Sequence, residues 1–113
     1  MKTCYILALI LVLCLAHSVY GATNEAIAQA IYQAEGAELA VKPYGILSVP
    51  CDSKESCKVI CLNTIRNQRV RHSNHECGLS YLECLQKRYA PLEAHKLNRN
   101  WLRLVNYFLN KEK

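Results

Sequence analysis

Five cysteines fall within residues 51–84, which read CDSKESCKVICLNTIRNQRVRHSNHECGLSYLEC. Cys57 and Cys61 are separated by three residues, and Cys77 and Cys84 are separated by six. Each pair therefore shares one face of a helix, one turn apart in the first pair and two turns apart in the second. Two antiparallel helices marked in this way can be joined by disulfides. The stretch predicts an all-α fold, a small disulfide-stabilised helical bundle.

Capping signals place the two helices of this predicted hairpin. Asp52 or Ser53 can cap a first helix that carries the first cysteine pair, because a short polar side chain accepts hydrogen bonds from the first turn. Ser73 and Glu76 match a capping box that would open the second helix, with Cys77 near its start. The polar residues between the two helices are expected to form the tip of the hairpin.

The pairing of the five cysteines stays open. The simplest hairpin joins Cys61 to Cys77 near the tip and Cys57 to Cys84 further out. Along the helix axis, Cys57 and Cys61 are about 6 Å apart and Cys77 and Cys84 about 10.5 Å apart, so this pairing leaves a mismatch of about 4.5 Å. A bond from Cys51 to Cys84, with Cys57 or Cys61 bonded to Cys77, relieves the mismatch. One cysteine remains unpaired. Cys51, which lies outside the helical register, is the most exposed candidate, and we expect the odd cysteine to link two copies as a homodimer. The alternatives are a buried reduced cysteine and a bond to a second protein.

The helical C-x3-C hairpin resembles the α-hairpinin peptides, and C-x3-C also occurs in insect odorant-binding proteins, which are secreted and helical. Two departures separate this sequence from those families. The second pair, Cys77 and Cys84, has C-x6-C spacing instead of C-x3-C. The interval from Cys51 to Cys57 is also much shorter than the long first interval of odorant carriers. Both resemblances cover under half of the chain, so no functional residue is transferred.

Residues 1–21 have the pattern of a signal peptide. Lys2 precedes an apolar run from Tyr5 to Ala16, and Gly21 is a small residue at the expected cleavage point. The apolar run spans about 18 Å, which is short of the roughly 30 Å hydrocarbon core of a membrane. We therefore expect a secreted, extracellular protein. Five of the seven cysteines remain after cleavage, and in an oxidising compartment they are expected to form disulfides.

The exported chain divides into two unlike halves. Residues 22–50 contain no cysteine, whereas residues 51–113 hold all five remaining cysteines. The whole chain has 14 Lys plus Arg against 9 Asp plus Glu, and most of the basic residues also lie in residues 51–113. In the first half we expect an Ala-rich helix from Asn24 to Val41 and an extended linker from Tyr44 to Pro50. This half either packs on the cysteine-containing helical domain or is a pro-segment that proteolysis removes.

The strongest helical periodicity lies near the C-terminus. A helix from Pro91 to about Asn110 would place apolar residues on one side and cationic residues on the other. Its apolar arc either closes the core or lies on an anionic membrane or in a receptor groove. The apolar arc comprises Ala94, Leu97, Trp101, Leu104, Val105 and Phe108. The residues of this helix expected to contact a partner are Lys96, Arg99, Trp101 and Arg103.

A further basic cluster lies in the predicted hairpin tip, at Arg66, Arg69, Arg71, His72 and His75. Such a run is either a solvated loop or a contact for an anionic receptor, glycan or lipid. We expect Arg66, Arg69 and Arg71 to contact an extracellular protein or an anionic membrane surface, because concentrated positive charge attracts acidic groups. A nucleic-acid partner is not expected, since no aromatic residue lies among these basic ones.

Catalytic and metal-binding signatures are weak in this sequence. His72, His75 and Cys77 lack regular zinc-ligand spacing, and no Walker, nucleophile-elbow or HExxH motif occurs. We expect no enzyme activity, no metal and no cofactor. The dibasic pair Lys87 and Arg88 matches a processing site.

Export, disulfides and the absence of a catalytic motif together predict a secreted helical effector that binds a protein partner, as venom, seminal, salivary or hormone-like polypeptides do. One alternative is a membrane-active or antimicrobial cationic peptide. Another is a carrier of small hydrophobic ligands.

Overall fold

The computed structural model describes residues 21–111, so the predicted signal peptide lies outside the described residues except for Gly21. Within this range the chain is all-helical and contains no strand, which confirms the predicted fold class. The α-helices are α2 (Asn24–Ala34), α3 (Lys54–Ser73), α4 (Tyr81–Tyr89) and α5 (Trp101–Lys111). Short 3-10 helices occur at Ala37–Leu39, Pro43–Gly45 and Lys96–Asn100.

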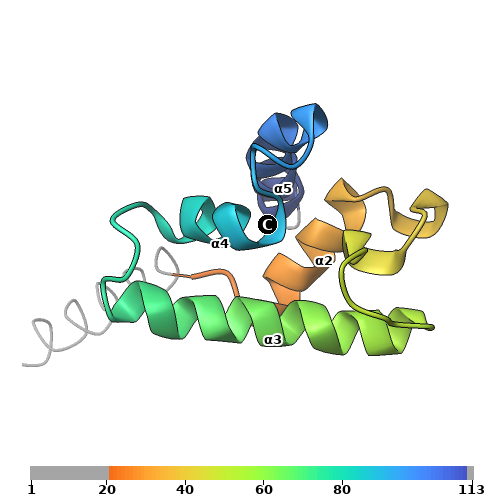
Figure 1. Ribbon diagram of the computed structural model, residues 1–113, viewed down its shortest axis with the longest axis horizontal. Helices are drawn as coiled ribbons and strands as arrows, with labels where there is room; N and C mark the ends of the chain where they lie inside the picture. The colour runs from red at the N-terminus through yellow and green to blue at the C-terminus, as the bar shows by residue number, and fades with distance from the viewer. Residues whose placement is uncertain (1–20, 112–113) are drawn as a thin grey trace, which may run out of the picture.

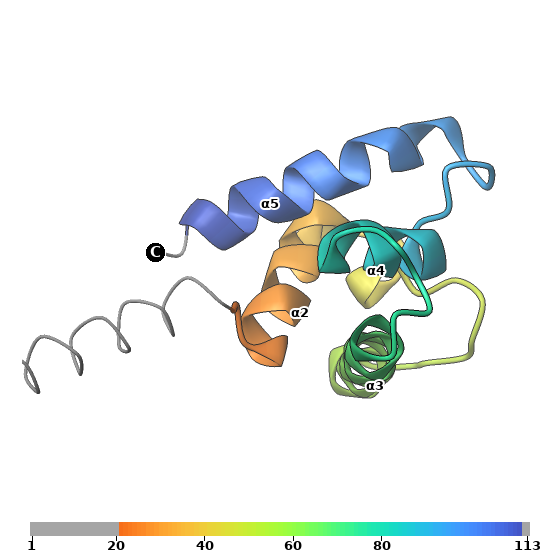
Figure 2. The ribbon, with the colours of Figure 1, turned by 90° about the vertical axis from the view of Figure 1, so that its left-hand side faces the viewer.

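The helices are arranged in layers, with α2 and α4 between α3 and α5 (Figure 2). Helices α3 and α4 form the predicted helical hairpin (Figure 1), in which the Tyr81 hydroxyl donates a hydrogen bond to the Ile65 carbonyl oxygen at 2.7 Å. Helix α2 packs most extensively against α5 and also contacts α3. The core therefore draws on all four helices. Its most deeply buried side chains include Ile31, Tyr44, Cys57, Cys61, Ile65, Leu85 and Val105.

Helix α2 is shorter than predicted. It ends at Ala34 because Gly36 adopts a left-handed conformation with φ of 110°, which an α-helix cannot continue. The predicted continuation to Val41 is wrong, and the Val41 side chain is exposed. The predicted extended linker is also wrong at its start, because Pro43–Gly45 form a 3-10 turn that buries Tyr44.

Helix α3 begins where the sequence predicts and ends later. The Ser53 side chain accepts a hydrogen bond from the Ser56 backbone N–H, and the Ser56 side chain accepts one from the Ser53 N–H. The helix then continues through residues 66–73, so the prediction of a polar hairpin tip there is wrong. A long-range contact holds this last part of the helix, because Arg69 donates a hydrogen bond to the Asn24 side chain.

Helix α4 is capped by Ser80 and not by the predicted Ser73. The Ser80 hydroxyl accepts a hydrogen bond from the Glu83 N–H and donates one to the Glu83 carboxylate at 2.7 Å. Ser73 is instead the last residue of α3, and residues 74–80 form the connecting turn. The prediction that Cys77 lies on a helix is therefore wrong.

The C-terminal helix starts at Trp101 and not at Pro91. The intervening residues form a turn and a 3-10 helix, in which the Asn98 side-chain amide donates a hydrogen bond to the Pro91 carbonyl oxygen at 2.8 Å. The predicted apolar arc is confirmed at Trp101 and Val105, which are both buried. Leu97 is exposed, because its backbone belongs to the 3-10 helix and not to α5.

Both disulfides are local. Cys51 bonds Cys57 with their Cα atoms 5.2 Å apart, and Cys77 bonds Cys84 with their Cα atoms 6.1 Å apart. The predicted bonds across the hairpin are wrong, because Cys77 lies in the turn next to the start of α4 and Cys51 lies beside the first turn of α3. The unpaired cysteine within residues 21–111 is the buried Cys61, so the choice of Cys51 as the exposed odd cysteine is also wrong.

Candidate functional site

The arginines predicted to contact a partner from the hairpin tip are separated along α3. Arg66 is exposed and Arg71 is half-buried. Arg69 is occupied within the fold: its guanidinium donates a hydrogen bond to the Ala22 carbonyl oxygen at 2.6 Å and lies 4.8 Å from the centre of the Tyr81 ring. Arg69 therefore ties the start of α2 to α3 and α4, and it is not free to bind a partner.

The partner-contact residues predicted near the C-terminus have two different environments. Lys96, Arg99 and Arg103 are exposed. The Trp101 ring is only 4% exposed and stacks on the Tyr89 ring with 5.7 Å between centroids. Trp101 is therefore a core anchor, and its ring is covered before any partner binds.

A cavity of about 480 Å³, which we term the basic hollow, lies between α3, the turn at residues 74–80 and α4. Arg71 comes from α3, and Lys87 and Arg88 come from α4, whereas Glu76 supplies the acidic side chain of the lining. Within residues 21–111, none of these three cations forms an ion pair. The basic hollow therefore carries surplus positive charge. Its lining is completed by Gln68, Cys77, Gly78 and Cys84.

Gln68 is the buried polar residue of the basic hollow. Its side chain is 3% exposed, and its Oε1 atom has no hydrogen-bond partner among the described residues. A buried polar atom is normally paired, because leaving it unpaired costs about 1–3 kcal/mol. Gln68 thus has an unused buried acceptor and is itself one of the residues that line the basic hollow.

The Cys77–Cys84 disulfide contributes to the lining of the basic hollow. It bonds the turn at residues 74–80 to the first half of α4. This covalent link fixes the turn that carries Glu76 relative to the helix that carries Lys87. The basic hollow is therefore built on connected elements and not on a free loop.

A second cavity, of about 370 Å³, lies between α4, the turn after it and α5. Leu79, Leu92 and Leu102 give it an apolar part, and the charged Glu83 and Lys87 also line it. Carriers of hydrophobic ligands have pockets lined mainly by apolar side chains. More of the lining surface is apolar than polar, as a carrier requires, and three charged residues, Glu83, Lys87 and Glu93, share the lining.

Titratable side chains surround the buried Cys61, among them the partly buried Tyr89 and Glu35. Burial raises the pKa of the Cys61 thiol to about 12, and burial also raises the pKa of the neighbouring Tyr89 hydroxyl. The pKa of the Glu35 carboxyl is raised by burial, and the nearby Trp101 indole lowers it in part. At neutral pH the Cys61 side chain is therefore a neutral thiol and a poor nucleophile.

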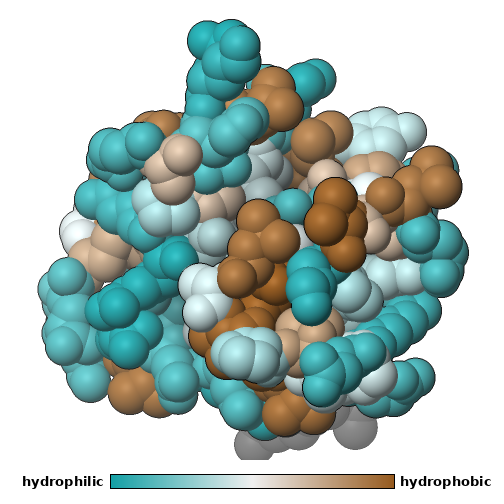
Figure 3. Space-filling view, turned by 45° about the vertical axis from the view of Figure 1, so that its right-hand side comes forward, coloured by the Kyte–Doolittle hydropathy of each residue, from teal (hydrophilic) through white to brown (hydrophobic). Residues whose placement is uncertain are grey.

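Residues 36–50, which we term the apolar loop, present large aliphatic side chains at the surface. Leu39 is 94% exposed and Val41 is 93% exposed, and Leu47 and Val49 are exposed as well. Hydrophobic side chains are visible on the face of the molecule that carries this loop (Figure 3). Four exposed aliphatic side chains on one loop make it a candidate interaction surface.

Contacts at the start and middle of the apolar loop hold it in place. Glu38 accepts a hydrogen bond from the Tyr32 hydroxyl and lies 3.7 Å from the Lys54 amine. The buried Tyr44 ring packs against the Tyr32 ring with 5.0 Å between centroids. The Tyr44 carbonyl oxygen also accepts a hydrogen bond from the Tyr89 hydroxyl. The middle of the loop is thus anchored in the core.

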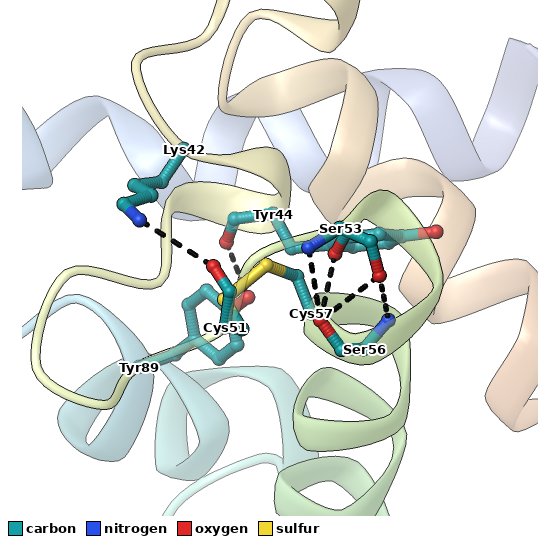
Figure 4. Close-up of a disulfide and its surroundings, with 7 residues drawn as sticks. All are labelled: Lys42, Tyr44, Cys51, Ser53, Ser56, Cys57 and Tyr89. Atoms are coloured by element: carbon teal, nitrogen blue, oxygen red, sulfur yellow. Dashed lines mark hydrogen bonds between the residues drawn. A yellow bond between two sulfur atoms is a disulfide. The ribbon is translucent and has the colours of Figure 1, made fainter.

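The end of the apolar loop is fixed by the first disulfide. Cys51 is bonded to Cys57 at the start of α3, and the Lys42 amine donates a hydrogen bond to the Cys51 carbonyl oxygen at 3.4 Å (Figure 4). Ala37 and Tyr44 have φ of 52° and 60°, in the left-handed region that residues other than glycine rarely adopt. Such conformations cost about 1–3 kcal/mol each and persist only where surrounding contacts impose them.

The sequence interpretation missed the apolar loop. The helical periodicity places Val41 in a helix and Leu47 in a linker. The segment nevertheless contains Gly36, Pro43 and Gly45 within ten residues. Closely spaced glycine and proline residues indicate specific turns, and this signal favours a structured loop over a helix. Gln68 was missed because an isolated glutamine in a polar helix carries no sequence signal.

Two features are absent from residues 21–111, a membrane-spanning helix and a group of metal-binding side chains. No helix in this range is both long enough and apolar enough to cross a membrane. No group of three or more His, Cys, Asp or Glu side chains in the same range is placed to hold a metal ion. His72 lies in α3, and Cys77 is bonded to Cys84.

Comparison of the chain with protein-family models, with curated proteins and with solved structures found no match.

Proposed function

We propose that the protein is secreted and acts outside the cell as an effector that binds a protein partner through the apolar loop. Two disulfides within residues 21–111 are consistent with an extracellular protein. The observation that carries the proposal is the near-complete exposure of Leu39 and Val41 on a loop whose backbone is fixed.

Fixed geometry matters because binding by a flexible loop costs conformational entropy. The apolar loop is anchored by Tyr44 in the core and by the Cys51–Cys57 disulfide at its end. A partner that covers Leu39 and Val41 would not have to order the loop first. Strained residues such as Ala37 support the same interpretation, since a fold retains such strain where a particular loop shape is needed.

The charges around the apolar loop favour a protein surface over a membrane. Glu38 pairs with Lys54, and Lys42 lies nearby, so the rim carries both signs of charge. A mixed polar rim around an apolar centre is typical of protein interfaces, whereas binding to an anionic membrane calls for a mainly cationic rim. The membrane-active alternative also loses its main support, because the apolar arc at Trp101 and Val105 packs inside the fold.

The experiment places a photoreactive leucine analogue at position 41 of the full-length exported protein and illuminates it on cells of the source tissue. A matched probe at position 59 serves as the control, because Val59 is 56% exposed on α3. We expect one protein to be cross-linked from position 41 and not from position 59, and excess unlabelled protein to abolish the cross-link.

Substitutions test the same surface quantitatively. Leu39→Ser combined with Val41→Ser should weaken saturable binding by about tenfold or more, as expected for residues at the centre of an interface. Val59→Ser combined with Val70→Ser removes two exposed side chains from α3 and should leave binding unchanged. The proposal fails if both pairs behave alike, if the chain binds protein-free anionic vesicles with equal affinity, or if the cross-linked product is a second copy of the chain.

A further inference from the structure

The basic hollow has cations that the fold itself does not neutralise. Lys54 and Lys58, at the other end of α3, are paired with Glu38 and Glu25. Within residues 21–111, Arg71, Lys87 and Arg88 have no such carboxylate partner, although they come from two helices and line one cavity.

The unpartnered Oε1 of Gln68 adds a second requirement. This atom accepts hydrogen bonds and cannot be satisfied by an anion, because an anion without hydrogen atoms also only accepts them. A ligand that combines a negative group for Arg71 and Lys87 with a hydrogen-bond donor for the Gln68 amide would satisfy both the unpaired charges and the unpaired acceptor of the basic hollow. Glu76, the acidic member of the lining, can accept a hydrogen bond from a second donor.

Size narrows the class of ligand further. About 480 Å³ accommodates a group the size of one or two sugar rings. A sulfated saccharide carries anionic sulfate esters next to hydroxyl groups that donate hydrogen bonds. The sulfate oxygens suit the guanidinium of Arg71, which can donate two parallel hydrogen bonds.

We propose that the basic hollow binds a sulfated saccharide unit, with the sulfate facing Arg71, Lys87 and Arg88 and a sugar hydroxyl donating to Gln68. This site is separate from the apolar loop, and it rests only on the extracellular part of the proposed function. The disulfide between Cys77 and Cys84 holds the lining in shape for this ligand.

The test is calorimetric titration of the full exported protein with a size-defined, fully sulfated heparin tetrasaccharide. Arg71→Gln combined with Lys87→Gln should weaken binding by about tenfold or more. Arg99→Gln combined with Arg103→Gln removes the same charge from exposed positions outside the basic hollow, and it should change the affinity by less than about twofold.

Gln68→Leu separates a specific site from general charge attraction. The variant should weaken binding of the tetrasaccharide several-fold and leave the weak binding of inorganic sulfate unchanged, since sulfate has no hydrogen to donate. Its thermal midpoint should equal or exceed that of the parent protein, because a buried unpaired acceptor has been removed. This stability measurement confirms that the loss of binding is not a loss of folding.

The proposal is overturned if the two charge-removing pairs weaken binding equally, which would indicate attraction by net charge alone. It is also overturned if vesicles that contain phosphoinositide bind more tightly than the tetrasaccharide, or if Gln68→Leu binds the tetrasaccharide normally. Leu39→Ser combined with Val41→Ser should retain full saccharide affinity, so failure of this proposal and failure of the protein-binding proposal are distinguishable.

Discussion

At the scale of single residues, burial controls the chemistry of the unpaired cysteine. Cys61 lies on the inner face of α3, and desolvation raises its pKa to about 12. A thiol reacts as its thiolate, so this environment suppresses oxidation and disulfide exchange. The homodimer predicted from an odd cysteine would need Cys61 to reach another molecule, and the core would have to open for that contact.

Cys61 should therefore be protected in the native protein. At pH 8, iodoacetamide should modify no cysteine of the folded, non-reduced exported chain, and after denaturation without reduction it should modify one. Mass spectrometry of the two samples counts the modified thiols. A covalent dimer on a non-reducing gel, or rapid native alkylation of Cys61, would contradict the structure.

Glu35 makes the stability of the fold depend on pH. Its carboxyl has a raised pKa in the folded state, so the folded protein holds this proton more tightly than the unfolded chain does. Stability should therefore fall as the pH rises from the ordinary glutamate pKa of 4.5 through the raised value, and then level off. Glu35→Gln should abolish this decline and raise the urea midpoint at pH 7. The exposed Glu93→Gln is the control, and an unchanged pH profile in Glu35→Gln would refute the prediction.

At the scale of helices, local patterns predicted the elements better than their ends. The Ser53 cap and the all-α class follow from short-range hydrogen bonding and periodicity, which a sequence displays directly. The sequence contains two S-x-x-E patterns, at Ser73 and at Ser80, and only Ser80 caps a helix. Helix α3 continues to Ser73 instead, and the hydrogen bond between Arg69 and Asn24, which are far apart in the chain, holds its last turns. Local patterns do not reveal such contacts.

The candidate sites were predictable only in part for the same reason. Arg71 was identified as a binding residue, but Lys87 and Arg88 join it only because the α3–α4 hairpin brings them together. The apolar loop was missed because Leu39 and Val41 are residue types that are usually buried, and sequence alone cannot show that they are exposed.

The packing of α2 gives a direct test of which helices form the core. Ile31 is fully buried where α2 meets its neighbours, so Ile31→Ala should lower the free energy of unfolding by about 2–5 kcal/mol. Val59→Ala on the exposed side of α3 should change it by less than about 0.5 kcal/mol. Urea unfolding of the two variants measures the difference. Equal effects would mean that α2 does not pack as described.

At the scale of the whole molecule, residues 22–50 are built into the fold. Helix α2 supplies core residues that contact α5 and α3, and Tyr44 from the apolar loop is buried beside them. Removal of this half would expose the inner surfaces of two other helices. The packing favours a single folded unit over a pro-segment followed by an active domain.

The exported product should consequently retain residues 22–50. We expect its intact mass to match a chain that begins at Ala22 and carries two disulfides, and peptide mapping to recover the Cys51–Cys57 and Cys77–Cys84 bonds. Processing at Lys87 and Arg88 is not expected, since both lie within α4 and a protease would have to unwind it. A secreted form that begins near Cys51 would disprove the single-unit interpretation.

The extensive packing of α2 against α5 joins the first and the last helix of the described chain, and this has a consequence for biogenesis. The core cannot close until α5 has left the ribosome, so the preceding residues from α2 onward lack a complete core until then. A translocation channel admits a chain only while the chain is unfolded. With the secretion that we propose, this topology delays folding until the chain reaches the compartment in which its cysteines can be oxidised.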